Sequence, residues 1–275
     1  MSYKDILVFL DDGATNAERV KAAFYLAKAH GAKLTGVSLA SLRPTHAKTS
    51  DDKAMTRMAE ELAHKLVEEF TQAATQADLT VSTIIIFGDA DTSALKMAHY
   101  ARNFDLVILR QPNPARANFS RLQEFAEQTM LHSGRPVFFM PYIGAHHIPC
   151  KKAMIAWDGT PTANRAVHDA MPMLAGANEV IILVIDSMKQ KKREDDKMTD
   201  NLVSHLTNHN VNAIVRKVNP GTFDVPTTIL NEIADNDIDI LVMGGYGTPS
   251  LQQKIFGGVT RSLLTSMITP VFMSH

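Results

Sequence analysis

Residues 242–247 read Val-Met-Gly-Gly-Tyr-Gly, and residues 257–260 read Gly-Gly-Val-Thr. The largely apolar run 238–243 predicts a buried strand that ends at the first of these glycines, and residues 259–264 predict the opening turns of a helix. Glycine lets the backbone approach a bound group closely, and the free N–H groups at a helix start attract anions. This order is typical of a phosphate site. The candidate contacts are Gly244, Gly247, Gly257, Gly258, Val259 and Thr260. The alternatives are ordinary turn glycines and an N-cap role for Thr260.

The chain also contains an internal repeat. Three pairs of segments correspond: 4–11 with 151–158, 105–109 with 239–243, and 136–140 with 270–273. The second and third pairs share one offset, 134 residues. Each copy is therefore about 140 residues long, an ordinary domain size. We predict two domains, residues 1–143 and 149–275, with Gly144 and Pro149 interrupting the pattern between them.

Apolar runs alternate with amphipathic segments in both halves, which predicts parallel α/β units with right-handed crossovers. Each half should form a doubly wound, five-stranded, mainly parallel sheet. The predicted strands are 6–10, 34–39, 81–87, 106–109 and 137–140, then 154–157, 180–185, 211–218, 238–243 and 270–273. Thr15 with Glu18 predicts a capping box, Gly31 a helix stop, and Thr160 before Pro161 an N-cap.

Ligands of open α/β sheets bind beyond the carboxyl ends of the strands. Asp158, the strand end near Ile185, and Gly244 all fall on that edge in the second half. Three features that converge on one edge support a binding site there better than any one of them alone.

The Gly-x2-Gly-x9-Gly spacing resembles the nucleotide-binding motif of the universal stress protein family, and the tandem repeat extends this resemblance over the whole chain. The chain has no Gly-x4-Gly-Lys-Ser/Thr P-loop. The resemblance implies an adenine nucleotide alpha hydrolase-like fold. It also implies that Asp158 lies against ribose or adenine or shares a cation with phosphate, that the main chain of Val184 contacts adenine, and that Met243 lies near the base or ribose. The alternatives are helix capping for Asp158 and core packing for Met243.

The family resemblance further implies a stress-response protein whose C-terminal domain binds ATP, ADP or AMP, with or without Mg²⁺, and regulates an unidentified protein. No catalytic residue is assigned. One alternative is a slow ATP phosphohydrolase, for which the sequence offers only Asp158, Thr260 and Arg261. Another is a scaffold, or a carrier of an apolar molecule or a metal, acting through the N-terminal domain.

The first half departs from the motif. The positions of the four glycines are taken by Arg110, Asn113, Gln123 and Glu124, and that of Thr260 by Ala126. Side chains thus stand where bare backbone is needed, and Glu124 places a carboxylate where phosphate would sit. We predict that the N-terminal domain does not bind ATP in this manner. Arg110, Arg116 and Arg121 are interpreted as a solvated basic loop, with a different anion as the alternative.

Composition and local patterns limit the classes of partner and the cellular location that we expect. There are 28 basic and 29 acidic residues, which does not favour nucleic acid. The longest apolar run, 180–185, is too short to span a bilayer, and the N-terminus lacks a signal-peptide pattern, so we expect a cytoplasmic protein. His146, His147 and Cys150 are too few ligands to predict a metal site. The mixed-charge run 189–197 predicts a solvated loop. The apolar last strand allows pairing of the two halves or a homodimer.

Overall fold

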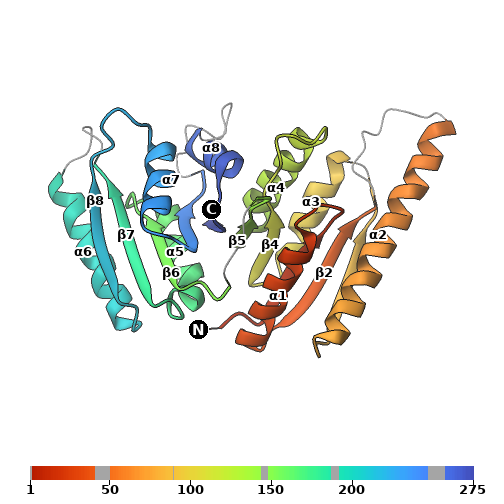
Figure 1. Cartoon of the computed structure of the whole chain (residues 1–275), viewed down its shortest axis with the longest axis horizontal. Helices are drawn as coiled ribbons and strands as arrows, with labels where there is room; N and C mark the ends of the chain where they lie inside the picture. Colours follow the sequence, from red (N-terminus) through yellow and green to blue (C-terminus); the bar gives the residue numbers. More distant parts are fainter. Residues whose placement is uncertain (1, 41–49, 89, 144–147, 187–191, 247–257) are drawn as a thin grey trace. The chain divides into compact units, whose positions relative to one another are not determined.

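The computed structural model spans the chain, and the structure describes residues 2–40, 50–88, 90–143, 148–186, 192–246 and 258–275. The chain divides into two compact units, Ser2–Ile143 and Gly144–His275, called here the N-terminal unit and the C-terminal unit. Helices and strands alternate along both of them (Figure 1).

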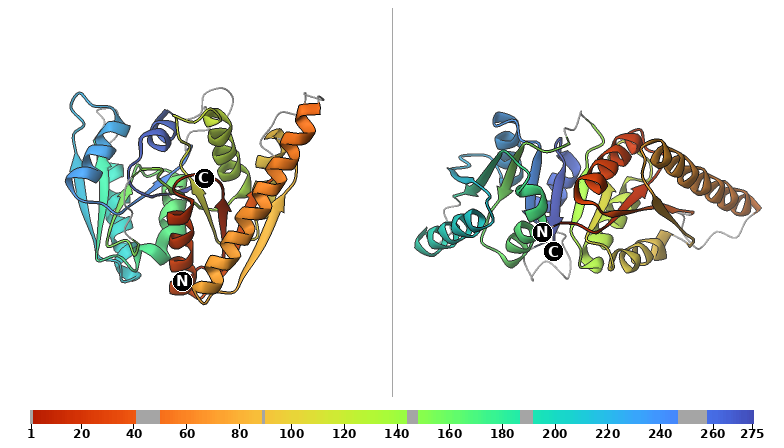
Figure 2. Two further views of the ribbon diagram at one scale, coloured as in Figure 1. Left: turned by 45° about the vertical axis from the view of Figure 1, so that its right-hand side comes forward. Right: turned by 90° about the horizontal axis from the view of Figure 1, so that it is seen from below.

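The N-terminal unit is a parallel sheet covered by helices. Its elements are β1 (Asp5–Leu10), α1 (Asn16–His30), β2 (Lys33–Leu39), α2 (Ser50–Gln76), β3 (Val81–Ile86), α3 (Ala90–Ala101), β4 (Leu106–Arg110), α4 (Phe119–Ser133) and β5 (Val137–Met140). The strand order is β3-β2-β1-β4-β5, and the paired strands are parallel. Helices α1 and α2 cover one face of this sheet and α3 and α4 cover the other (Figure 2).

The C-terminal unit repeats this topology. Its elements are β6 (Lys152–Ala156), α5 (Pro161–Leu174), β7 (Glu179–Ile185), α6 (Lys192–Asn208), β8 (Ala213–Val218), α7 (Val225–Asp235), β9 (Ile240–Gly244), α8 (Gly258–Ser266) and β10 (Val271–Ser274). The order is β10-β9-β6-β7-β8, again parallel. The predicted fold class, two tandem doubly wound parallel α/β sheets, is confirmed.

The central strands are apolar on both faces because helices cover both faces. Residues 106–109 of β4 and 137–139 of β5 are at most 1% exposed. Such strands appear in the sequence as unbroken apolar runs, since neither face meets water. This burial explains why the strands could be predicted from short runs without alternation.

Two of the three predictions made from capping residues at helix ends are confirmed. Gly31 ends α1 with a left-handed φ of 60°, and Thr160 caps α5 by accepting a hydrogen bond from Ala163 N, with Pro161 next to it. The predicted capping box at Thr15 is wrong: Thr15 has φ −98° and ψ 11°, and its side chain makes no capping hydrogen bond. The backbone there is not extended as an N-cap requires.

One further difference concerns the surface. Helix α6 begins at Lys192, so most of the mixed-charge run predicted as a loop lies in its first turns. Charge indicates contact with solvent and does not by itself exclude a helix. Among the described residues, no helix has both the length and the apolar character needed to cross a membrane.

Candidate functional site

The start of α5 organises the sheet edge of the C-terminal unit. Asp158 follows β6, and its Oδ1 accepts hydrogen bonds from the backbone N–H of Thr160 at 3.0 Å and from Thr160 Oγ1 at 2.6 Å. Thr160 Oγ1 accepts a hydrogen bond from Ala163 N at 3.3 Å. The Asp158 side chain is exposed, and within the described part of the chain its Oδ2 has no hydrogen-bond partner. Asp158 therefore supports the helix cap with one oxygen and keeps the other available.

Gly244 ends β9 directly beneath this helix start. A Cβ atom there would lie 2.5 Å from Ala163 N and 2.7 Å from the carbonyl carbon of Thr162. Real Cβ atoms do not approach backbone so closely, so glycine is required for α5 to pack on β9. Strand β9 pairs with β6, which brings Gly244 next to the loop of Asp158. The structure thus gives Gly244 a packing role that needs no ligand.

The residues after β9 are held by hydrogen bonds from two directions. Gly245 N donates to Ser274 O at 2.8 Å, and Tyr246 N donates to Thr260 Oγ1 at 3.4 Å. Thr260 is the third residue of α8 and only 4% exposed, so it is not an N-cap, and its hydroxyl supports the loop that follows Gly244. Gly258 and Val259 begin α8 and are exposed, and no described atom lies within 4 Å of a Cβ built at Gly258.

The remaining predicted residues are spread along the sheet edge. Val184 is half-buried near the end of β7, and Met243 is buried in β9, as its core-packing interpretation requires. Gly247 and Gly257 lie outside the described residues, as do His146 and His147. Burial raises the pKa of the Cys150 thiol to about 12, with a further contribution from Asp239.

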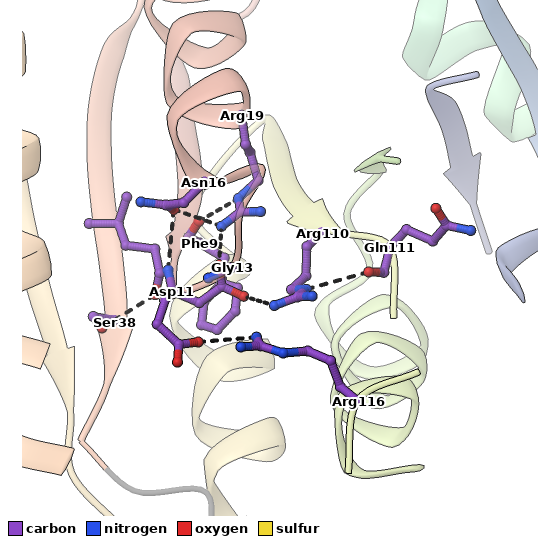
Figure 3. A network of polar contacts seen from close by, with 11 residues as sticks. Phe9, Asp11, Gly13, Asn16, Arg19, Ser38, Arg110, Gln111 and Arg116 are labelled. Atoms are coloured by element: carbon purple, nitrogen blue, oxygen red, sulfur yellow. Dashed lines mark hydrogen bonds and ion pairs between the residues drawn. The ribbon is translucent and has the colours of Figure 1, made fainter. Parts of the chain in front are cut away.

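The matching edge of the N-terminal unit is filled by its own side chains (Figure 3). Asp11 follows β1 as Asp158 follows β6, and Arg110 ends β4 where Gly244 ends β9. Arg110 Nη1 forms an ion pair with Asp11 Oδ2, and Arg19 Nη2 lies 2.8 Å from Asp11 Oδ1. Pairing of β1 with β4 places these residues side by side.

Arg19 supports the network from inside α1. Its side chain is fully buried, with Nε donating to Phe9 O at 2.7 Å and Nη2 to Asn16 Oδ1 at 2.7 Å. Burial alone would raise the pKa of Asp11, but Arg19 and Arg110 hold that pKa below its ordinary value. The carboxylate is therefore charged and neutralised internally.

Comparison with known proteins identifies the family. The sequence profile of the Universal stress protein family matches residues 2–141 and again residues 149–275. The chain belongs to the universal stress protein family. Similar solved structures include a universal stress protein from Archaeoglobus fulgidus DSM 4304 (17% identity, covering 98% of this chain and 95% of that chain, TM-score 0.73). Another is a putative universal stress protein from Pseudomonas aeruginosa UCBPP-PA14 (13% identity, 99% and 93%, TM-score 0.62). No curated protein matches.

These likenesses establish the fold of this tandem universal stress protein, which is adenine nucleotide alpha hydrolase-like in both units. The interpretation of Arg110 as part of a solvated loop is wrong, because this residue is 5% exposed and paired. Glu124, which corresponds to Gly258 at the offset of 134 residues, does not lie at a helix start. Helix α4 begins at Phe119, so Glu124 lies inside it and is exposed.

Sequence reasoning missed Arg19 altogether. Arg19 lies four residues before Ala23 and seven before Leu26, both of which are buried in α1. A charged residue at such spacing shares the apolar face of its helix and needs a buried partner. That signal, with Asp11 at the end of the preceding strand, could have predicted the ion pair.

Proposed function

We propose that the C-terminal unit binds an adenine nucleotide, ATP or otherwise ADP or AMP, and that the bound state regulates a partner protein. Membership of the universal stress protein family supports this proposal. The observation that carries it is the contrast between two equivalent sheet edges in one chain.

In the N-terminal unit, two guanidinium groups neutralise Asp11, and one of them, that of Arg110, occupies the end of β4. In the C-terminal unit, glycine ends the equivalent strand, and Asp158 is exposed with one carboxylate oxygen unpartnered among the described residues. The exposed start of α8 adds backbone N–H groups with the positive end of the helix dipole, a combination suited to phosphate. In the N-terminal unit, side chains of the chain itself pair with the carboxylate at the sheet edge. In the C-terminal unit, a carboxylate oxygen and the N–H groups at the start of α8 remain for a ligand.

The proposed roles follow from these positions. The start of α8, at Gly258 and Val259, would hold phosphate together with Gly247 and Gly257. Asp158 would accept a hydrogen bond from a ribose hydroxyl or share Mg²⁺ with the phosphates, an arrangement that Mg²⁺ commonly adopts.

Three further residues complete the proposed site. The main chain of Val184 would contact adenine, with Met243 beside the base or ribose, and Thr260 would support the loop. We propose binding without hydrolysis, because the sequence has no P-loop lysine and offers only Asp158, Thr260 and Arg261 for that chemistry.

Fluorescence of Trp157 tests this function. It is the only tryptophan of the chain, is 8% exposed, and immediately precedes Asp158. The full chain is titrated with ATP, ADP, AMP and GTP, with and without Mg²⁺. We expect saturable changes with adenine nucleotides, and at least about tenfold weaker binding in Gly258→Val, equivalent to about 1.4 kcal/mol.

The Gly258→Val variant is suited to this test because no described atom opposes a Cβ at that position. Its matched control is Glu124→Val, at the equivalent and exposed position of the N-terminal unit, which should leave binding unchanged. The proposal fails if adenine nucleotides produce no fluorescence change and no heat in calorimetry, or if Gly258→Val binds as tightly as wild type.

A further inference from the structure

Three histidines are in ring contact on the C-terminal unit, away from the strand ends described above. His168 lies on α5, His205 on α6, and His209 just after α6 ends at Asn208. The ring centroids of His168 and His205 are 4.7 Å apart, and those of His205 and His209 are 4.6 Å apart. We call these three residues the histidine cluster. His205 is its centre and joins two helices on the same face of the sheet.

The surroundings of the central ring, His205, suit its neutral form. His205 Nε2 is buried and has no hydrogen-bond partner among the described residues. Protonation would give this nitrogen an N–H donor with no acceptor, which is costly in a buried position. It would also place a cation in contact with the rings of His168 and His209.

The charged groups on the packed elements do not offset this cost. On α5, Arg165 donates to His275 O at 2.9 Å, and Asp169 accepts from Ser274 Oγ at 2.8 Å. Asp196 of α6 is paired with Lys217 of β8. Burial, followed by His168 and His209, lowers the pKa of His205 below its ordinary value.

We propose that the histidine cluster is a proton-sensitive contact, in which protonation of His205 in mild acid weakens the packing of α6 against α5. The sign follows from linkage. The pKa of this histidine is lower in the folded state than the ordinary histidine pKa of 6.5, which applies to the unfolded chain. Its contribution to stability is therefore complete above pH 6.5 and is lost as the pH falls below 6.5. The described residues hold no group of three ligands arranged for a metal ion, which favours protons over a metal. This inference is independent of nucleotide binding.

Urea unfolding of the full chain, followed by Trp157 fluorescence at pH 7.5 and pH 5.5, tests the proposal. Trp157 belongs to the same unit and reports on it. The His205→Phe variant keeps an aromatic ring that cannot be protonated. Between the two pH values, the folded-to-unfolded ratio should fall about fivefold more in wild type than in this variant. His64→Phe, an exposed position on α2 in the other unit, should behave as wild type.

A second variant guards against misfolding of His205→Phe. His168→Phe lies at an exposed position of α5 and removes one neighbour of His205, so its loss of stability in acid should lie between the other two. Equal pH dependence in wild type and both variants would overturn the proposal. Stabilisation of wild type, but not of His205→Phe, by added Zn²⁺ would also overturn it, because the cluster would then be a metal site.

Discussion

Arg110, the last residue of β4, determines how the charge of Asp11 is paired at the sheet edge of the N-terminal unit. Arg110 reaches Asp11 across the paired strands, and a Cβ at Gly13 would lie only 2.7 Å from Arg110 Nη1. The second ion pair of this edge, Arg116 with Asp12 at 3.1 Å, is much more exposed. Buried and exposed ion pairs differ in what their loss costs, because only a buried charge is left without solvent.

The first prediction concerns Arg110. Arg110→Gln leaves Asp11 buried with Arg19 alone and should destabilise the N-terminal unit by about 3 kcal/mol. Urea unfolding followed by far-UV circular dichroism measures this loss, while Trp157 fluorescence should stay at its wild-type midpoint. Arg116→Gln is the matched control and should cost less than about 1 kcal/mol. Equal effects of the two substitutions would show that the Asp11 network does not stabilise the unit.

The network around Asp11 shows which features of the N-terminal edge could be predicted from the sequence and which could not. Substitution of the glycines by Arg110 and its neighbours was sufficient to predict that the N-terminal edge differs from the C-terminal one. The partners of Arg110 could not be predicted, because its contact with Asp11 joins positions 99 residues apart and depends on which strands pair. Arg19 was overlooked since charged residues on amphipathic helices are usually exposed.

At the scale of elements, α5 connects the features of the candidate site in the C-terminal unit. Its cap, Thr160, is bonded to Asp158, and its first turn rests on Gly244. Further along the same helix, His168 contacts the centre of the histidine cluster. A shift of α5 would therefore change both its packing on Gly244 at the sheet edge and its ring contact with α6.

The second prediction tests the packing of α5 on β9. Gly244→Ala places a Cβ against backbone atoms of α5 and should destabilise the C-terminal unit by about 2 kcal/mol, as overpacking does. Gly176→Ala is the control, because its nearest neighbour would be Met173 O at an ordinary 3.5 Å, and its effect should stay within about 0.5 kcal/mol. Trp157 fluorescence in urea measures both. Wild-type stability of Gly244→Ala would refute the packing role.

Elements were predicted most reliably where burial is complete on both faces. The run 137–140 coincides with β5, since a strand covered on both faces appears in the sequence as a continuous apolar run. Errors lie at exposed ends. The third predicted strand included Phe87, but β3 ends at Ile86 and Phe87 is 51% exposed. Hydrophobicity alone does not mark where the hydrogen-bonded ladder stops.

For the whole molecule, the repeat in the sequence corresponds to two units of one topology with different sheet edges. The fold and the family could be predicted from the repeat and the glycine spacing, because both depend on residue types along the chain. The side-chain networks could not, because they depend on contacts between distant segments. We therefore propose that the C-terminal unit binds the ligand, whereas internal ion pairs occupy the equivalent edge of the N-terminal unit.

The stoichiometry of ATP binding to the full chain tests this assignment most directly. Isothermal titration calorimetry of wild type with ATP and Mg²⁺ should give one nucleotide per chain, and Asp158→Asn should weaken this binding while Asp12→Asn, on the equivalent edge of the N-terminal unit, leaves it unchanged. Two nucleotides per chain would contradict the proposal that internal ion pairs leave no nucleotide site at the N-terminal edge. No binding, or binding lost in Asp12→Asn and kept in Asp158→Asn, would contradict a site in the C-terminal unit.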